Sequence, residues 1–139
     1  MPIDNGRPPT PAEIFGAALE SLNGENLDGL IERCTDDVVF EFPFAPNGKP
    51  RRIEGKDQVR DYLGALPGIE ITAPPSIDVH QTTDPDKAVI EMRATGRVTT
   101  TGAPFDQSYV VVLVVSDGLI SRYRDYWNPL VALETEKSA

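Results

Sequence analysis

An aspartate between aromatic residues near the C-terminus is the group in this chain best suited to chemistry. Asp125 belongs to a predicted strand that starts near Leu119, after the turn Ser116-Asp117-Gly118. Strand side chains alternate between two faces, so one face is expected to carry Leu119, Ser121, Tyr123, Asp125 and Trp127. The other face then carries Ile120, Arg122, Arg124 and Tyr126, and its arginines favour water. The Asp125 face is therefore predicted to point inward.

An inward-facing carboxyl group has two possible roles. Desolvation penalises its charged form, which makes Asp125 a candidate proton donor or acceptor. A structural carboxylate that accepts hydrogen bonds from nearby donors is the other possibility. The residue pattern leaves both open.

Other reactive residue types give weaker signals. His80 is the only histidine, and it shares a strand face with Asp78, so we expect it to be exposed and incidental. Tyr62 and Tyr123 could donate hydrogen bonds into a pocket or simply pack in the core. Cys34 is expected on the apolar side of a helix. No metal-ligand spacing, glycine-rich phosphate loop, CxxC or GxSxG motif is present, so we expect no metal and no cofactor.

Composition excludes several classes of partner. The chain has 139 residues and a formal net charge of -9, which disfavours nucleic acid and anionic membrane surfaces. A single cysteine excludes an internal disulfide. No stretch reaches the roughly 18 apolar residues of a membrane span, and no secretion signal is seen. The expected location is cytoplasmic.

The first half of the chain reads as helices around one strand. Thr10-Pro11-Ala12-Glu13 predicts a capped helix start, and Asn23-Gly24 predicts its end. A second helix is expected at about 26–34, a strand at 38–42 and a third helix at about 55–66. The proline-rich loop 43–50 carries Phe44, which could cover the mouth of a pocket or pack on the body of the domain.

The second half reads as strands. Segments 69–72 and 77–81 flank Pro74-Pro75, which predicts a bend or an edge. Alternation is clear over 88–98, where Ala88, Ile90, Met92 and Ala94 face inward. The run 109–115 is apolar on both faces, so we expect the helices to cover one face and a second copy of the chain to cover the other. We predict a loose tail over 1–9, one domain over 10–131 and a frayed tail over 132–139.

This order predicts an α+β domain in which three helical segments pack on a strongly bent, mainly antiparallel sheet that encloses a pocket. With Asn26-Leu27-Asp28-Gly29-Leu30, Glu41-Phe42-Pro43-Phe44-Ala45-Pro46, Glu54-Gly55-Lys56 and the Tyr123–Pro129 ending, the chain resembles the NTF2-like superfamily. Within it, the chain is most similar to SnoaL-like polyketide cyclases and phenazine-biosynthesis A/B proteins. The resemblance implies a cone-shaped fold, a mostly apolar pocket and a dimer through the sheet. It does not imply one reaction, because such folds host many.

The resemblance can be tested against two enzyme types of this superfamily. Ketosteroid isomerases carry a base, a tyrosine and an acid where this chain has Phe42, Ala18 and Val111. Limonene epoxide hydrolases use an Asp-Arg-Asp set, of which Asp125 matches one member. The other two places fall on Met92 and Ala94, so neither enzyme's full set is present.

The resulting hypothesis is a pocket protein, acting on a small, flat, largely apolar metabolite by proton transfer in cyclisation, isomerisation or condensation. Asp125 is the predicted general acid/base. The predicted substrate-binding residues are Tyr123, Trp127, Phe42, Phe44, Tyr62 and Met92. A non-catalytic ligand carrier and a dimeric scaffold with a vestigial pocket remain as alternatives.

Overall fold

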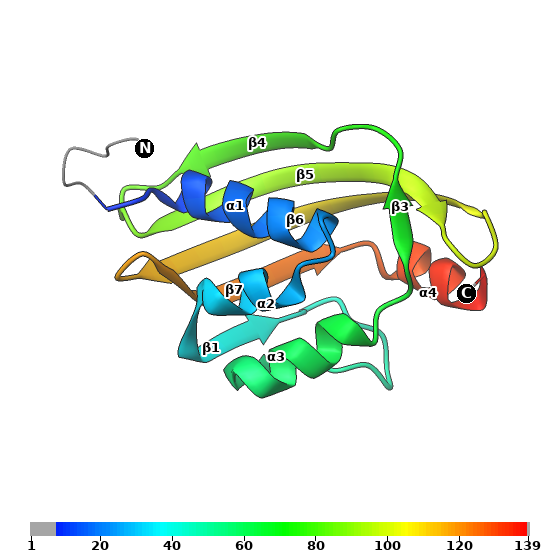
Figure 1. Ribbon diagram of the computed structural model, residues 1–139, viewed down its shortest axis with the longest axis horizontal. Helices are drawn as coiled ribbons and strands as arrows, with labels where there is room; N and C mark the ends of the chain where they lie inside the picture. The colour runs from blue at the N-terminus through cyan, green and yellow to red at the C-terminus, as the bar shows by residue number, and fades with distance from the viewer. Residues whose placement is uncertain (1–7, 139) are drawn as a thin grey trace.

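The computed structural model describes residues 8–138, so the predicted tail 1–9 lies almost wholly outside the described residues. Three helices, α1 (Pro11–Asn23), α2 (Leu27–Glu32) and α3 (Gly55–Gly64), lie on one side of a curled sheet (Figure 1), as predicted. No helix within 8–138 is long and apolar enough to cross a membrane.

The start of α1 follows its sequence signal. The Glu13 amide donates to the Thr10 hydroxyl at 3.2 Å, and the Thr10 amide donates to the Glu13 carboxylate at 2.8 Å. This capping box satisfies two amides that the first turn leaves without helical partners. It fixes the helix so that Ile14, Phe15 and Ala18 are buried.

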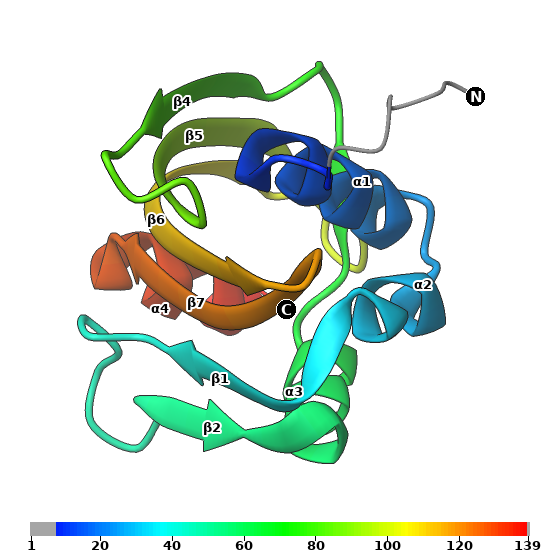
Figure 2. The ribbon, with the colours of Figure 1, turned by 90° about the vertical axis from the view of Figure 1, so that its left-hand side faces the viewer.

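The sheet is mixed and remains open. Its strands are β1 (Cys34–Glu41), β2 (Arg52–Glu54), β3 (Ile69–Ile71), β4 (Ser76–Gln81), β5 (Lys87–Val98), β6 (Pro104–Ser116) and β7 (Leu119–Trp127). They lie in the order β2-β1-β7-β6-β5-β3, with β4 also paired to β5; β1 and β7 are parallel and all other pairs are antiparallel. In Figure 2 the sheet curls from β4 to β2, and α1 and α2 lie along its open side. The α+β prediction is confirmed.

The predicted bend at Pro74-Pro75 separates β3 from β4 along one edge of β5. β3 pairs with residues 96–98 of β5, and β4 pairs with residues 88–93. The break lets a long, curved β5 keep partners at both ends. β3 passes so close to Gly96 that a Cβ there would meet the carbonyl oxygen of Glu70. This position therefore requires glycine.

A bulge in β7 corrects part of the predicted face pattern. Arg122 pairs with Val114 and Ile120 pairs with Val115, so Ser121 is an extra residue. Its hydroxyl donates to the carbonyl of Val114 at 3.1 Å. The extra residue reverses the alternation before it: Ile120 is fully buried and Leu119 is 36% exposed. The predicted inward position of Leu119 is wrong, whereas the pattern from Tyr123 to Trp127 holds.

The structure differs from the sequence prediction at three further places. Residues 52–54, assigned to no element, form β2 against β1. Cys34 opens β1 and is not on a helix. The tail predicted to fray after residue 131 is instead helix α4 (Pro129–Ser138). Its cap is Asn128, whose side chain accepts from the Leu130 amide at 3.0 Å, with Pro129 in the first turn.

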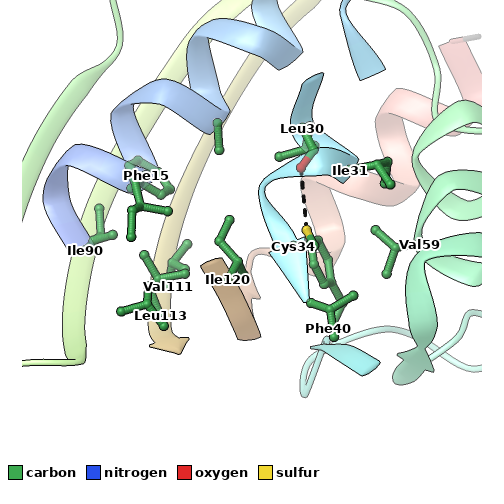
Figure 3. Packing of buried hydrophobic residues seen from close by; sticks show 14 of the residues in the cluster. Phe15, Leu30, Ile31, Cys34, Phe40, Val59, Ile90, Val111, Leu113 and Ile120 are labelled. Atoms are coloured by element: carbon green, nitrogen blue, oxygen red, sulfur yellow. Dashed lines mark hydrogen bonds between the residues drawn. The ribbon is translucent and has the colours of Figure 1, made fainter. Parts of the chain in front are cut away.

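The hydrophobic core fills the space between α1–α3 and the concave face of the sheet. Figure 3 shows Phe15 on the β5–β6 side and Val59 on the β1 side of the same cluster. The largest fully buried side chains include Ile90, Leu113 and Ile120. Several core side chains, among them Phe15, Phe40 and Ile120, also line a cavity on the inner side of the sheet.

Candidate functional site

The cone holds a cavity of about 580 Å³ between the helices and the inner sheet face. Its walls are mostly apolar, and they include Phe15, Leu19, Leu30, Phe40, Phe42, Met92, Phe105 and Ile120. Such volume and lining are typical of small-molecule sites.

Asp125 lines this cavity from near the C-terminal end of β7. It pairs with Val111 of β6, and Tyr123 and Trp127, two positions before and after it on β7, line the cavity with it. Its Oδ1 is buried and accepts no hydrogen bond from any residue within 8–138. Burial raises the pKa of Asp125 from 3.8 to about 7, because nothing repays the lost hydration of the charged form. Near neutral pH this carboxyl group can therefore both give and take a proton.

Tyr123 and Trp127 lie beside Asp125 on the same face of β7, as the alternation predicts. The ring of Tyr123 stacks on Phe40 with centroids 4.8 Å apart. Burial, reinforced by the charge of Asp125, raises the pKa of Tyr123 well above its ordinary value. The phenol is thus neutral at physiological pH and can only donate or accept a hydrogen bond.

A second aromatic group closes the cavity from the α3 side. Phe42, directly after β1, stacks on Tyr62 of α3 at 4.7 Å and lies 6.3 Å from the Trp127 ring. Met92 lines the cavity from β5. The rings of Phe42, Tyr62 and Trp127 offer flat surfaces, which suit a flat ligand. All are predicted site residues that the fold brings together around Asp125; their role in binding stays a prediction.

Phe44 is the exception among the predicted binding residues. It is 57% exposed and does not line the cavity. Its ring meets Tyr126 edge-on at 5.3 Å, on the outer face of β7. The Ala45 amide bonds to the Phe42 carbonyl at 3.1 Å, and this turn sends Phe42 inward and Phe44 outward. Of the two alternatives for Phe44, this position therefore fits packing on the body of the domain and not covering the mouth of the cavity.

Sequence reasoning missed Tyr109 and Gln107 on β6, which both line the cavity. Tyr109 pairs with Trp127 across the strands. Gln107 donates to the carbonyl of Asn128 and accepts from its amide, both at 3.1 Å. Gln107 thereby ties β6 to the start of α4, whose Ala132, Leu133 and Thr135 complete the cavity wall. Their place in the cavity wall follows from the pairing of β6 with β7, which the sequence pattern of β6 alone does not give.

The other reactive groups lie away from the cavity or are inert. His80 is exposed, as predicted, and its Nε2 lies 2.8 Å from Glu91 and 3.5 Å from Asp78 on the outer sheet face. Cys34 is fully buried, and its thiol donates to the Leu30 carbonyl at 3.6 Å. Burial raises the pKa of that thiol to about 11, so it is a poor nucleophile.

Helices that pack on a curled sheet enclose an apolar cavity here, and a buried acid faces that cavity. This combination is typical of small-molecule pocket proteins. The SnoaL-like domain family matches residues 15–123, and the chain belongs to this family. The predicted resemblance is thereby confirmed. The matched segment ends two residues before Asp125.

Two relatives and one solved structure extend this match. The chain is 44% identical to the uncharacterized protein YesE of Bacillus subtilis (strain 168) over 79% of this chain and 76% of the relative. It is 34% identical to the PhzA/B-like protein PA3332 of Pseudomonas aeruginosa over 88% and 86%. A crystal structure of a candidate isomerase from B. subtilis superposes with a TM-score of 0.84, at 35% identity, covering 92% and 93%.

More distant structures share the fold. A candidate polyketide cyclase from Pseudomonas putida KT2440 has a TM-score of 0.72 at 18% identity, covering 94% of this chain and 99% of that chain. Mycobacterium tuberculosis RV0760c, solved with estradiol-17beta-hemisuccinate, has a TM-score of 0.69 at 20% identity, covering 88% and 98%.

Proposed function

We propose that this protein is a cofactor-independent enzyme that moves protons on a flat, largely apolar metabolite, in a cyclisation, isomerisation or condensation. Asp125 is the general acid/base, and Tyr123 and Trp127 hold the ring system of the substrate. One observation carries the proposal: the Oδ1 atom of Asp125 is buried at a cavity wall without a hydrogen-bond partner. A buried group left unpaired is costly, and a bound ligand can supply the missing partner.

The pKa of Asp125 suits this role. A general acid/base works best when its pKa lies near the operating pH, and that of Asp125 is about 7. Proton transfer by a well-placed side chain typically contributes about 10²–10⁴-fold in rate. Orientation of the substrate between flat walls supplies the rest.

The walls support a ring-bearing ligand. Two stacked aromatic pairs, Phe40–Tyr123 and Phe42–Tyr62, line the cavity together with Asp125. The steroid derivative bound by RV0760c shows that a protein of this fold accepts a flat, fused-ring ligand.

Solvent-deuterium exchange tests the proposal. The three candidate reactions share one step, removal of a proton next to a polarised carbon. 2-Tetralone, a flat ring ketone, offers such protons, and their exchange in D₂O is followed by NMR. We expect the wild type to exchange them at least about 100-fold faster than Asp125→Asn.

Equal exchange by the two proteins, with 2-tetralone still bound, would contradict the enzyme proposal. That result would favour the non-catalytic carrier, which uses the same pocket without proton transfer.

A further inference from the structure

Three exposed side chains bring nitrogen and oxygen ligands together on the outer face of the sheet, at its β4 edge. Asp78 and His80 are two positions apart on β4, so they share a face. Glu91 of β5 pairs directly with Asp78. One ligand atom from each of the three lies within 4.8 Å of the other two. None of the three residues lines the cavity, so this group is separate from the Asp125 site.

The spacing of the three ligand atoms is close to that around a metal ion. The Nε2 atom of His80 lies 2.8 Å from Oε1 of Glu91 and 3.5 Å from Oδ2 of Asp78. Ligands bound to a tetrahedral zinc ion at its usual bond lengths lie about 3.3–3.6 Å from one another. Because all three side chains are exposed, rotation about their side-chain bonds can bring the atoms to these separations.

Hydrogen bonding among the three residues does not satisfy both acids. The carboxylates of Asp78 and Glu91 approach the same ring nitrogen, and that nitrogen carries at most one hydrogen. Even if His80 is protonated, one negative charge of the group stays unbalanced. A divalent cation bound to the neutral imidazole balances both carboxylates and contacts all three ligand atoms.

No neighbouring cation takes this place. Arg93, the next outward residue of β5 after Glu91, donates to both carboxylate oxygens of Asp106, at 2.9 and 2.6 Å. On the other side, Glu91 pairs with Val110 of β6, which carries no charge. Within residues 8–138, the only ion-pair partner of Asp78 and of Glu91 is His80.

We propose that Asp78, His80 and Glu91 bind one divalent transition-metal cation of the zinc type per chain. Zinc accepts imidazole nitrogen and carboxylate oxygen together, and water can fill the fourth position. Mg²⁺ and Ca²⁺ favour oxygen ligands alone, so the imidazole selects against them. The sequence pattern shows no metal-ligand spacing, because only the pairing of β4 with β5 brings Glu91 to His80.

A bound ion joins β4 to β5 through their side chains. Within the described part of the chain, the backbone of β4 pairs with β5 alone, at one edge of the sheet (Figure 1). The three ligands come together only when these strands pair, so the ion binds the folded protein in preference to the unfolded chain. Zinc should therefore raise the melting temperature.

Calorimetry on the full chain tests this inference. The protein is treated with EDTA, dialysed, and titrated at pH 7 with ZnCl₂ and separately with MgCl₂. We expect one Zn²⁺ per chain and at least about 100-fold weaker binding of Mg²⁺. Free Zn²⁺ at about a hundred times its dissociation constant should raise the melting temperature by about 5–10 °C.

Variants of the three ligands locate the site. His80→Gln, Asp78→Asn and Glu91→Gln should each weaken Zn²⁺ binding at least about tenfold, because loss of a group that only orients a ligand already costs about 10–100-fold. Glu70→Gln is the matched control: Glu70 is an equally exposed acid beside β5, where Arg97 pairs with it at 2.9 Å. It should leave Zn²⁺ binding unchanged. Melts without metal establish that each variant is folded.

Equal affinity for Zn²⁺ and Mg²⁺ would overturn the inference, because it would show an acidic surface without a built site. Zn²⁺ binding that is absent, or that persists unchanged in His80→Gln, would overturn it as well. One ion for every two chains would contradict a site within a single chain. The proposed function stands in all these cases, because it rests on the cavity at the inner face.

Discussion

At the scale of single residues, the account depends on how Asp125 is surrounded. Strand alternation alone was enough to predict that Asp125, Tyr123 and Trp127 face inward. It left open whether the carboxyl group is satisfied by donors, because donors come from other strands. The structure places apolar and phenolic side chains around it and leaves Oδ1 unpaired. The functional interpretation is therefore favoured over a structural carboxylate.

Asp125→Asn should raise stability at alkaline pH. Because the folded pKa is raised from 3.8 to about 7, wild-type stability falls as pH rises from about 4 to about 7. The amide has no charge to desolvate. We expect the variant to match the wild type near pH 4 and to exceed it at pH 8 by on the order of 4 kcal/mol, measured by urea unfolding.

Asp106→Asn is the matched control, since Asp106 is exposed and its pKa is lowered by hydrogen bonds from Arg93. A carboxyl group whose pKa is lower in the folded than in the unfolded protein stabilises the fold at pH values above its unfolded pKa. Asp106→Asn should therefore lose stability at pH 8 and not at low pH. A loss of stability in Asp125→Asn at pH 7 would show that Asp125 is a structural carboxylate.

Epoxide hydrolysis should be undetectable. Met92 and Ala94 are buried apolar residues at the places where the resemblance requires an arginine and a second acid. Asp125 alone lacks the partners to activate water and open the ring. Turnover of limonene oxide, followed by chromatography of the diol, should not exceed the rate without protein. Turnover that disappears in Asp125→Asn would contradict this prediction.

At the scale of elements, the sequence predicted what local patterns encode. The α1 capping box, the α3 helix, the bend at Pro74-Pro75 and the inward face of β5 were all visible in it. The β7 bulge, the inward Tyr109 and the short β2 were not, because each depends on pairing with a distant strand. The α4 helix had a local signal in Asn128-Pro129, which is typical of a helix start. The prediction of a frayed tail gave more weight to the polar residues that follow.

Gly96→Ala tests how closely β3 approaches β5. A methyl group at this position would meet the Glu70 carbonyl, so the strands must shift. We expect a loss of about 1–3 kcal/mol in the free energy of unfolding. Gly16→Ala in α1 is the control: nothing lies within 4 Å of its Cβ, and the change should stabilise by up to about 1 kcal/mol. Equal effects of the two changes would contradict the predicted clash.

At the scale of the whole molecule, the outer sheet face leaves apolar side chains partly exposed. Val110, Val112 and Val114 alternate outward along β6 and pair with Tyr126, Arg124 and Arg122 of β7. Val110 is 39% exposed, and the ring pair Phe44–Tyr126 lies on the same face. Helices α1–α3 lie against the inner face, so the expected cover for this outer patch is a second copy of the chain.

Sedimentation at micromolar concentration should give twice the mass of one chain. Val110→Asp should shift the protein to the single-chain mass, because a charge would be buried at the interface. Leu130→Asp, at a more exposed leucine on α4, should leave the dimer intact. A wild type that sediments as one chain would rule the dimer out.

The most direct test of the account is the titration of Asp125 itself. The ¹³C chemical shift of its carboxyl carbon can be followed by NMR from pH 3 to pH 9, with Asp125→Asn identifying the signal. Because the burial of an unpaired carboxyl group is the basis of the proposed chemistry, we predict a midpoint near 7. A midpoint at or below about 4, the value of an ordinary aspartate, would contradict the account.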